Sequence, residues 1–162
     1  MHNSESISIA MKGGLFNFRV AGIAINKGKV LLHKTEEDEF WSFPGGRVEM
    51  FEFSRETLLR EMMEETGLLV EVGNLSRIVE NFFEYNNIRH HELGLYYQMK
   101  FVSLINQDDF TCRDGDNELL FRWFNLTDIH LLKIYPEGII LELLSDTESI
   151  SHLTIAFQNL HQ

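Results

Sequence analysis

The chain has 162 residues, of which 44% are hydrophobic and 24% charged, so we predict a single domain, residues 1–162, with a normal core. The formal net charge of −11 argues against binding to long DNA or RNA, which depends on clustered Lys and Arg, but leaves a small phosphorylated substrate open. Cys112 is the single cysteine, so no intrachain disulfide can form, and a reducing, cytoplasmic location is expected.

The N-terminal part of the chain predicts a short extension followed by a hairpin. Residues 1–14 lack a signal-peptide pattern and the chain contains no run of 18 apolar residues, so we expect a flexible extension and no membrane partner. Apolar runs rich in β-formers predict antiparallel strands over 16–25 and 30–34, joined by a turn that contains Gly28. A short strand over 40–43 then precedes a break at Pro44-Gly45-Gly46.

The next segment predicts one helix, residues 55–66, with an acidic face beside an apolar one. Ser54 is a good N-cap and Gly67 a good residue to follow the C-terminus. At the helical angle of about 100° per residue, three carboxylates share one arc: Glu61, Glu64 and Glu65. The neighbouring arc is apolar: Leu58, Leu59, Met62 and Met63.

Crowded carboxylates at the C-terminal end of a helix need compensation. Like charges three and four residues apart repel each other by a few tenths of a kcal/mol, and the helix dipole also disfavours anions at this end. A divalent cation such as Mg²⁺, which prefers oxygen ligands, would supply the missing positive charge. The competing interpretation is an ordinary solvated helix face, which most charge runs are.

The remainder of the chain predicts further strands and a second helix. The helix begins near Pro136 and runs through apolar positions up to Leu144. We predict the strands over 68–72, 78–85, 92–104, 119–125 and 150–157, with a turn at Asn86-Asn87 and a polar loop over 106–117. Strands arranged around two helices favour an α/β fold in the form of an α/β/α sandwich.

The segment from Gly46 to Leu68 follows the pattern G-x5-E-x7-R-E-U-x-E-E-x-G-U, where U is an apolar residue, at every specified position. This pattern is the Nudix box, and the chain resembles the Nudix hydrolase family. Weaker similarities, such as Trp41 before the box and Arg122-Trp123-Phe124 after it, extend the resemblance over residues 16–145. The resemblance also implies an α/β/α sandwich with a mixed sheet.

The resemblance implies an activity and its cofactor. Nudix hydrolases cleave a diphosphate bond in a nucleoside diphosphate that is linked to another group, X, and they depend on Mg²⁺, with Mn²⁺ as a substitute ion. We therefore expect a small nucleotide substrate, and a homodimer stays open by analogy with the family. The alternative is a non-catalytic Nudix domain that binds a nucleotide as a sensor or regulator.

The box positions also imply roles for individual residues. Glu61, Glu64 and Glu65 match the metal-binding and catalytic positions of the family. We expect Glu61 and Glu65 to be direct ligands and Glu64 to be either a ligand or the base that orients or deprotonates the water. The resemblance suggests the carbonyl of Gly46 as another metal ligand, and Glu118 is the candidate for a further acid from a later loop.

Arginines near the box are candidates for structural and phosphate-binding roles. Arg60 and Glu52 are expected to form a structural pair between the loop and the helix. Arg19 and Arg47 are candidates for substrate phosphate contacts, although each fits an ordinary surface arginine equally well. Phe51 stands where many relatives have glycine, which puts the transfer of a relative's substrate in doubt.

Two further groups of residues are candidates for contact with the substrate. His90-His91-Glu92 resembles a metal cluster in the sequence, but neighbouring residues on a strand point to opposite faces. Aromatic residues at strand spacing could stack a base, although such residues are more often part of the core: Phe82, Phe83, Tyr85, Tyr96 and Tyr97.

Overall fold

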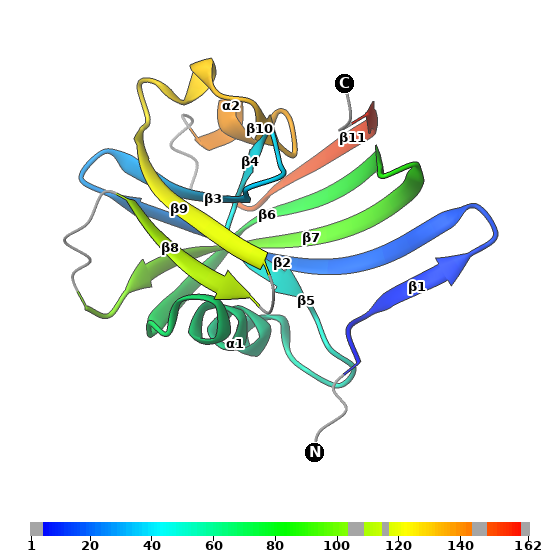
Figure 1. Cartoon of the computed structure of the whole chain (residues 1–162), viewed down its shortest axis with the longest axis horizontal. Helices are drawn as coiled ribbons and strands as arrows, with labels where there is room; N and C mark the ends of the chain where they lie inside the picture. The colour runs from blue at the N-terminus through cyan, green and yellow to red at the C-terminus, as the bar shows by residue number, and fades with distance from the viewer. Residues whose placement is uncertain (1–4, 104–108, 115–116, 144–148, 160–162) are drawn as a thin grey trace.

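A long bent strand connects the two halves of the β-structure in the computed structural model, which describes residues 5–103, 109–114, 117–143 and 149–159 (Figure 1). In chain order the strands are β1 (Ser8–Met11), β2 (Gly14–Asn26), β3 (Lys29–Thr35), β4 (Trp41–Ser42), β5 (Gly45–Arg47), β6 (Val70–Tyr85), β7 (Ile88–Phe101), β8 (Asp109–Asp114), β9 (Asn117–Asn125), β10 (Ile134–Tyr135) and β11 (Ser151–Asn159). The helices are α1 (Ser54–Thr66), the short 3₁₀ helix η1 (Ile129–Leu131) and α2 (Ile139–Leu143).

Strand β2 organises the sheet. Most of its length pairs with β7 in parallel and with β1 and β5 antiparallel, whereas its last two residues pair with β3. One half of the sheet continues from β7 to β6 and β11, and the other continues from β3 to β4, β9, β8 and β10. The pairs β2–β7, β6–β11 and β4–β10 are parallel and the others are antiparallel, so the sheet is mixed.

Two hydrophobic cores hold the layers together. The first contains Leu58 and Met62 of α1, both fully buried against strand residues such as Val20. The second contains Ile139 of α2, packed with residues such as Trp41. The helices α1 and α2 therefore lie on opposite sides of the strands (Figure 1), and the predicted α/β fold with a mixed sheet is confirmed.

The prediction of the first helix is correct in extent, but its predicted N-cap is wrong. The N-cap is Phe53, whose backbone N–H donates to the Glu56 carboxylate at 3.3 Å, and Ser54 is the first helical residue. Gly67 ends the helix in the left-handed conformation, as predicted. Of the predicted apolar arc only half is buried, because Leu59 and Met63 keep 42% and 40% of their surface exposed.

Three predictions outside the first helix are also corrected. The predicted strands 68–72 and 78–85 are one continuous strand, β6, whose register shifts between Val72 and Arg77 because of bulges. Most of the predicted polar loop 106–117 is β8 together with the start of β9, and the remainder lies outside the described residues. The predicted flexible extension contains β1, which pairs with β2, while residues 1–4 also lie outside the described part.

The other elements follow the sequence prediction closely. The hairpin between β2 and β3 turns at Lys27 and Gly28, both with positive φ, and the hairpin between β6 and β7 turns at Asn86 and Asn87 in the same way. Helix α2 and strand β11 occur where they were predicted, although Leu144 lies outside the described residues.

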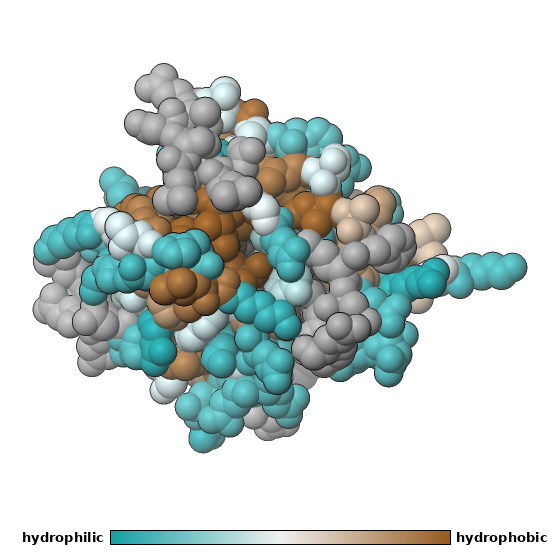
Figure 2. All heavy atoms as spheres, turned by 90° about the horizontal axis from the view of Figure 1, so that it is seen from above, coloured by the Kyte–Doolittle hydropathy of each residue, from teal (hydrophilic) through white to brown (hydrophobic). Residues whose placement is uncertain are grey.

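The surface is mostly polar around a hydrophobic centre on the side that carries α2. Figure 2 looks down on this side and shows hydrophobic residues gathered near its middle, with hydrophilic residues around them. Within the described ranges, none of the helices has the length and apolar character needed to cross a membrane.

Candidate active site

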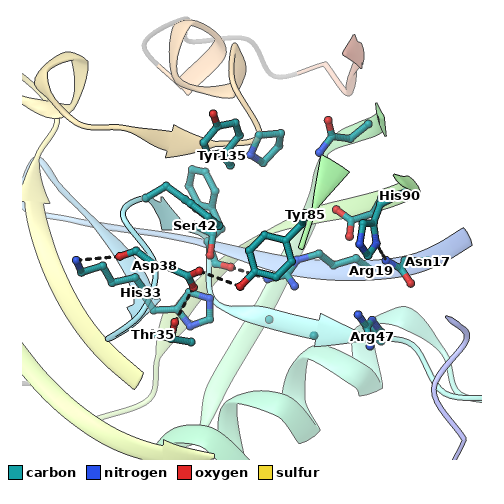
Figure 3. Close-up of a pocket in the computed structure, with 18 of the residues that line it drawn as sticks. Asn17, Arg19, His33, Thr35, Asp38, Ser42, Arg47, Tyr85, His90 and Tyr135 are labelled. Atoms are coloured by element: carbon teal, nitrogen blue, oxygen red, sulfur yellow. Dashed lines mark hydrogen bonds between the residues drawn. The ribbon is translucent and has the colours of Figure 1, made fainter. Parts of the chain in front are cut away.

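An open cavity of about 450 Å³ lies where the two halves of the sheet meet α1 (Figure 3). Its walls come from strands β2 to β7, from β9 and β10, and from one face of α1. The volume falls in the range of small-molecule sites, about 300–1,000 Å³. The cavity is therefore large enough to hold much of a nucleotide.

Two of the three predicted carboxylates of α1 line this cavity. Glu61 and Glu65 are four residues apart, so they lie on the same face of the helix, and both belong to the cavity wall. Their side chains are 17% and 8% exposed, whereas that of Glu64 is 59% exposed and is not part of the wall. Glu64 thus lies on the solvent side of the acidic face.

Gly46 provides a cradle for the Glu61 carboxylate. Strand β5 pairs with β2 through Gly46 and Val20, and this pairing holds the glycine against α1. A Cβ atom added to Gly46 would lie 2.1 Å from the Glu61 carboxyl carbon, a distance that real structures do not contain. The absence of a side chain therefore lets the carboxylate and the β5 backbone approach each other closely.

Arg60 connects the loop before α1 to the acidic face of the helix. Its Nε donates to Glu52 Oε1 at 2.9 Å and its Nη2 donates to Glu52 Oε2 at 3.1 Å, which is a bidentate pair. Its Nη1 donates to Glu61 at 2.9 Å and to Glu64 at 3.1 Å, and Nη2 also reaches the Arg47 carbonyl at 3.2 Å. One guanidinium thus fixes the loop, the helix and β5 relative to one another.

The carboxyl groups around Arg60 have shifted pKa values. Burial raises the pKa of Glu61 above its usual value, and the hydrogen bond from Arg60 opposes this shift only in part. Burial would also raise the pKa of Glu52, but hydrogen bonds from Arg60 and Thr57 outweigh it and hold this pKa below the usual value. Glu52 is therefore a stable anion, while Glu61 sits where a nearby positive charge would favour its ionised form.

Behind Glu65 lies a histidine that the sequence reasoning did not identify. His33 of β3 is 7% exposed, lines the cavity and packs against the Phe121 ring. Its Nδ1 lies 3.9 Å from Glu65 Oε2, and burial lowers the pKa of the imidazole to about 3, so the ring is neutral near pH 7. A lone histidine in a strand carries no signal in the sequence, because only the fold brings it to the helix.

The wall formed by β2, β5 and β7 carries the predicted arginines. Arg19 and Arg47 are register partners across β2 and β5, and both line the cavity (Figure 3). The Arg19 guanidinium donates to the Phe43 carbonyl at 3.1 Å. Both arginines also act electrostatically on Glu92, whose pKa is nevertheless raised by burial. The cavity therefore places positive charge near the carboxylates of α1.

The aromatic candidates divide between the cavity and the core. Phe83, Tyr85 and Tyr96 line the cavity, whereas Tyr97 is part of the first core. Phe82 lies on the other face of β6, where its ring packs on His91 at a centroid distance of 4.5 Å. This arrangement agrees with the expectation that adjacent strand residues point to opposite faces.

Glu118, the candidate for a further acid, is directed away from α1. It pairs with Arg113 across β8 and β9, whereas the next pair along is Cys112 with Leu119. Leu119 lines the cavity, and the charge of Glu65 acts on the Cys112 thiol, so this second pair faces α1. Because side chains alternate along a strand, Glu118 lies on the opposite face, and its role as a further acid stays a prediction.

The donor set fits a hard divalent cation that completes its shell with other oxygens. Across the described ranges, no three His, Cys, Asp or Glu side chains converge as a ready metal cage, so the protein alone does not surround an ion. Mg²⁺ commonly binds through one or two carboxylates and keeps waters or substrate phosphates as further ligands. Glu61, Glu65 and the backbone at Gly46 supply such a partial set on the cavity wall.

Comparisons with known proteins give one family for most of the chain. A family model described as the NUDIX domain matches residues 16–141. The chain is 26% identical over 132 residues to the Nudix hydrolase YvcI of Bacillus subtilis (strain 168), an alignment that covers 80% of this chain and 79% of that protein. It is 34% identical over 68 residues to the MutT-like protein of Streptomyces ambofaciens, covering 41% of this chain and 44% of that protein. The match thus spans less than half of the Streptomyces protein.

The fold is also similar to a solved structure. The crystal structure of the MutT NUDIX hydrolase from Burkholderia pseudomallei superposes with a TM-score of 0.64 at 22% identity, covering 80% of this chain and 98% of that one.

Proposed function

The chain belongs to the Nudix hydrolase family, and from this premise we propose that it hydrolyses a diphosphate bond in a nucleoside diphosphate linked to another group, with Mg²⁺ as its cofactor. Candidate substrates are nucleoside triphosphates, nucleotide sugars and ADP-ribose.

The observation that carries this proposal is the pairing of opposite charges across one cavity. Glu61 and Glu65 line one wall, and Arg19 and Arg47 line another. A diphosphate is highly anionic, so its hydrolysis requires neutralisation of charge and a positioned water molecule. The arginines can bind phosphate oxygens directly, whereas the carboxylates can reach a phosphate only through a cation.

The proposed roles follow from the position of each side chain. Glu61, Glu65 and the carbonyl of Gly46 would hold Mg²⁺, which when bound neutralises phosphate charge and lowers the pKa of a bound water. Glu64 lies at the exposed edge of the same helix, where its carboxylate is held by Arg60 at 3.1 Å. There it would orient the attacking water or accept its proton.

Arg60 and Glu52 act as positioning residues in this proposal. Their bidentate pair holds the loop against α1, and the same guanidinium fixes the Glu61 carboxylate. Arg19 and Arg47 would bind the phosphate groups and orient the scissile bond toward the acidic wall. Such alignment lowers the barrier because reacting groups are held close before reaction.

A hydrolysis screen with Mg²⁺ tests the proposal. The panel consists of nucleoside triphosphates, nucleotide sugars, ADP-ribose, dinucleoside polyphosphates and NADH, with chromatographic identification of the phosphorylated products. We expect turnover of at least one compound at the diphosphate bond and its loss when EDTA removes the metal. Nucleotide binding without any turnover would instead favour a sensor, and the enzymatic proposal would be rejected.

A further inference from the structure

A row of polar side chains in the cavity is not used by the proposed chemistry. Asn17, Glu92 and Asn81 are register partners across β2, β7 and β6, and all three line the cavity. Arg19 and its partner Arg47 form a second row, here called the arginine row. Arg19 follows Asn17 by two residues along β2, so the two side chains lie on the same face of the strand. The row is therefore displaced by about 7 Å from the proposed phosphate contacts.

Asn17, the first member of the row, already uses its side-chain amide in hydrogen bonds within the protein. Asn17 Oδ1 accepts a hydrogen bond from Ser8 Oγ at 2.7 Å, and Asn17 Nδ2 lies 3.0 Å from His90 Nδ1. The His90 ring in turn stacks on Phe83 at a centroid distance of 4.7 Å. Asn17 is thus fixed, and its contacts hold this end of the cavity in place.

The other two members have unused hydrogen-bonding capacity. Asn81 is 5% exposed, and its side-chain amide makes no hydrogen bond among the described residues, so its NH₂ group is free to donate to a ligand. Beside it, the Glu92 carboxylate has no hydrogen bond and no ion pair within that described part, although Arg19 and Arg47 act on it electrostatically. Both side chains therefore have polar groups available to a ligand: two acceptor oxygens on Glu92 and the amide of Asn81.

We propose that Glu92 and Asn81 recognise the base edge of a guanine nucleotide in this cavity, an inference that rests on the proposed function and names its substrate class. An ionised carboxylate only accepts hydrogen bonds, so it selects an edge with adjacent N–H donors. Guanine offers two such donors, N1–H and the 2-amino group, which the two Glu92 oxygens can accept together. Adenine and cytosine place an acceptor beside their amino group, and uracil has one N–H between two acceptors.

Asn81 completes the recognition of the same edge. Guanine O6 lies next to N1–H and requires a donor, which the Asn81 amide supplies through its NH₂ group. The arginine row then lies toward α1, on the side where the phosphates would approach Glu61 and Glu65. In Figure 3 Arg47 lies beside α1, and Asn17 and His90 lie on the same side of the cavity but farther from the helix. One nucleotide would therefore extend from the polar row to the acidic helix.

The test measures binding rather than turnover, in the absence of metal. Equilibrium dissociation constants are determined for GDP, IDP, ADP and CDP with the wild-type protein and with Glu92→Gln, which keeps the shape but replaces one acceptor with a donor. We expect wild type to bind GDP about 10-fold more tightly than IDP, which lacks the 2-amino group, and about 10- to 100-fold more tightly than ADP or CDP. Glu92→Gln should reduce this preference to within about 3-fold.

Two further variants make the result specific. Asn81→Asp replaces the donor to O6 with a carboxylate, so GDP and IDP should both bind about 10-fold more weakly. Glu71→Gln changes an exposed carboxylate on β6 that pairs with Lys100 at 2.9 Å, and the preference for guanine should be unchanged. An equal loss for every base in Glu92→Gln, or a wild-type protein without a guanine preference, would overturn the inference.

The binding test also separates this inference from the proposed activity. A guanine preference that depends on Glu92, in a protein that hydrolyses none of the panel, would support the subsite and reject the hydrolase proposal. Turnover of nucleotides without any dependence on the base would support the hydrolase proposal and reject the guanine subsite.

Discussion

At the scale of single residues, the candidate site depends on how closely a backbone and a carboxylate approach each other. The Glu61 carboxylate occupies the space that a side chain on residue 46 would fill, and a hydrogen bond from Arg60 holds this carboxylate in place. The motif spacing singled out Gly46, Glu61 and Glu65, which all line the cavity. The spacing did not show that Gly46 acts through the space it leaves free, since that depends on the pairing of β5 with β2.

Replacing Gly46 with alanine should impair activity more than stability. The added methyl group would lie 2.1 Å from the Glu61 carboxyl carbon and would displace it. A displacement of about 1 Å at a catalytic group lowers the rate about 100-fold, so we expect kcat/KM for the preferred substrate to fall by about that factor. Steady-state kinetics measure the effect. Gly13→Ala is the matched control, because an added Cβ there meets no atom within 4 Å.

The Arg60–Glu52 pair should make folding sensitive to acid. The pKa of Glu52 lies below its usual value of 4.5 in the folded protein, so its ionised form stabilises the fold above that pH. This stabilisation is lost as the pH falls from 4.5 through the lower folded value. We expect Glu52→Gln to be less stable than wild type at pH 7 and to show a shallower loss of stability below pH 5. Urea unfolding at several pH values measures the difference, and parallel curves for the two proteins would contradict the account.

At the scale of elements, the loop between β5 and α1 stores strain beside the site. Phe51 has a φ of 65° and is 99% exposed, so it adopts a backbone conformation that favours glycine and gains no burial in return. The resemblance identified this position as unusual, and the structure shows that its side chain points into solvent.

Phe51→Gly should therefore stabilise the protein. Relief of the left-handed strain contributes about 1–2 kcal/mol, and the greater freedom of glycine in the unfolded chain removes part of it. We expect a net gain of about 1 kcal/mol in the free energy of unfolding, measured with urea. Met50→Gly serves as the control, since Met50 is 54% exposed in the same loop but has no positive φ, and it should not gain stability. A loss of stability in Phe51→Gly would show that the side chain has a structural role.

The elements also show where prediction from the sequence reaches its limit. The amphipathic helix and the β2–β3 hairpin were predicted because periodicity and turn residues are local signals. Strand β8 was missed because its polar residues read as a loop, and only pairing with β9 makes it a strand. The face of β9 on which Glu118 lies could not be predicted either, since the face of a strand is set by its register. His33 and Asn81 were missed because strands distant in sequence bring them into the cavity.

At the scale of the whole molecule, a site made of opposite charges should couple metal binding to stability. Glu61 and Glu65 come from α1, Gly46 from β5, and the arginines from β2 and β5, so a bound ion would connect elements that fold together. An ion that binds the folded state alone stabilises it in proportion to the logarithm of its concentration above Kd. Thermal stability therefore reports on the metal site without any assumption about the substrate.

Mg²⁺ should raise the unfolding temperature of wild type and have little effect on Glu65→Gln. At 100 times Kd the gain is about 2.7 kcal/mol for one ion that binds only the folded state. Differential scanning fluorimetry over a range of Mg²⁺ concentrations measures it, with Na⁺ at equal ionic strength as the control. Equal shifts in wild type and in Glu65→Gln would place the ion elsewhere.

Turnover by the carboxylate variants tests the central claim most directly. The measurement is kcat for the preferred nucleotide, as a function of Mg²⁺ concentration, in wild type, Glu61→Gln, Glu65→Gln and the surface control Glu71→Gln. We predict that both cavity variants lose at least about 100-fold in kcat while they keep the wild-type circular dichroism spectrum, and that Glu71→Gln is unchanged. Wild-type turnover in folded Glu61→Gln and Glu65→Gln would show that the acidic wall of this cavity is not the catalytic metal site.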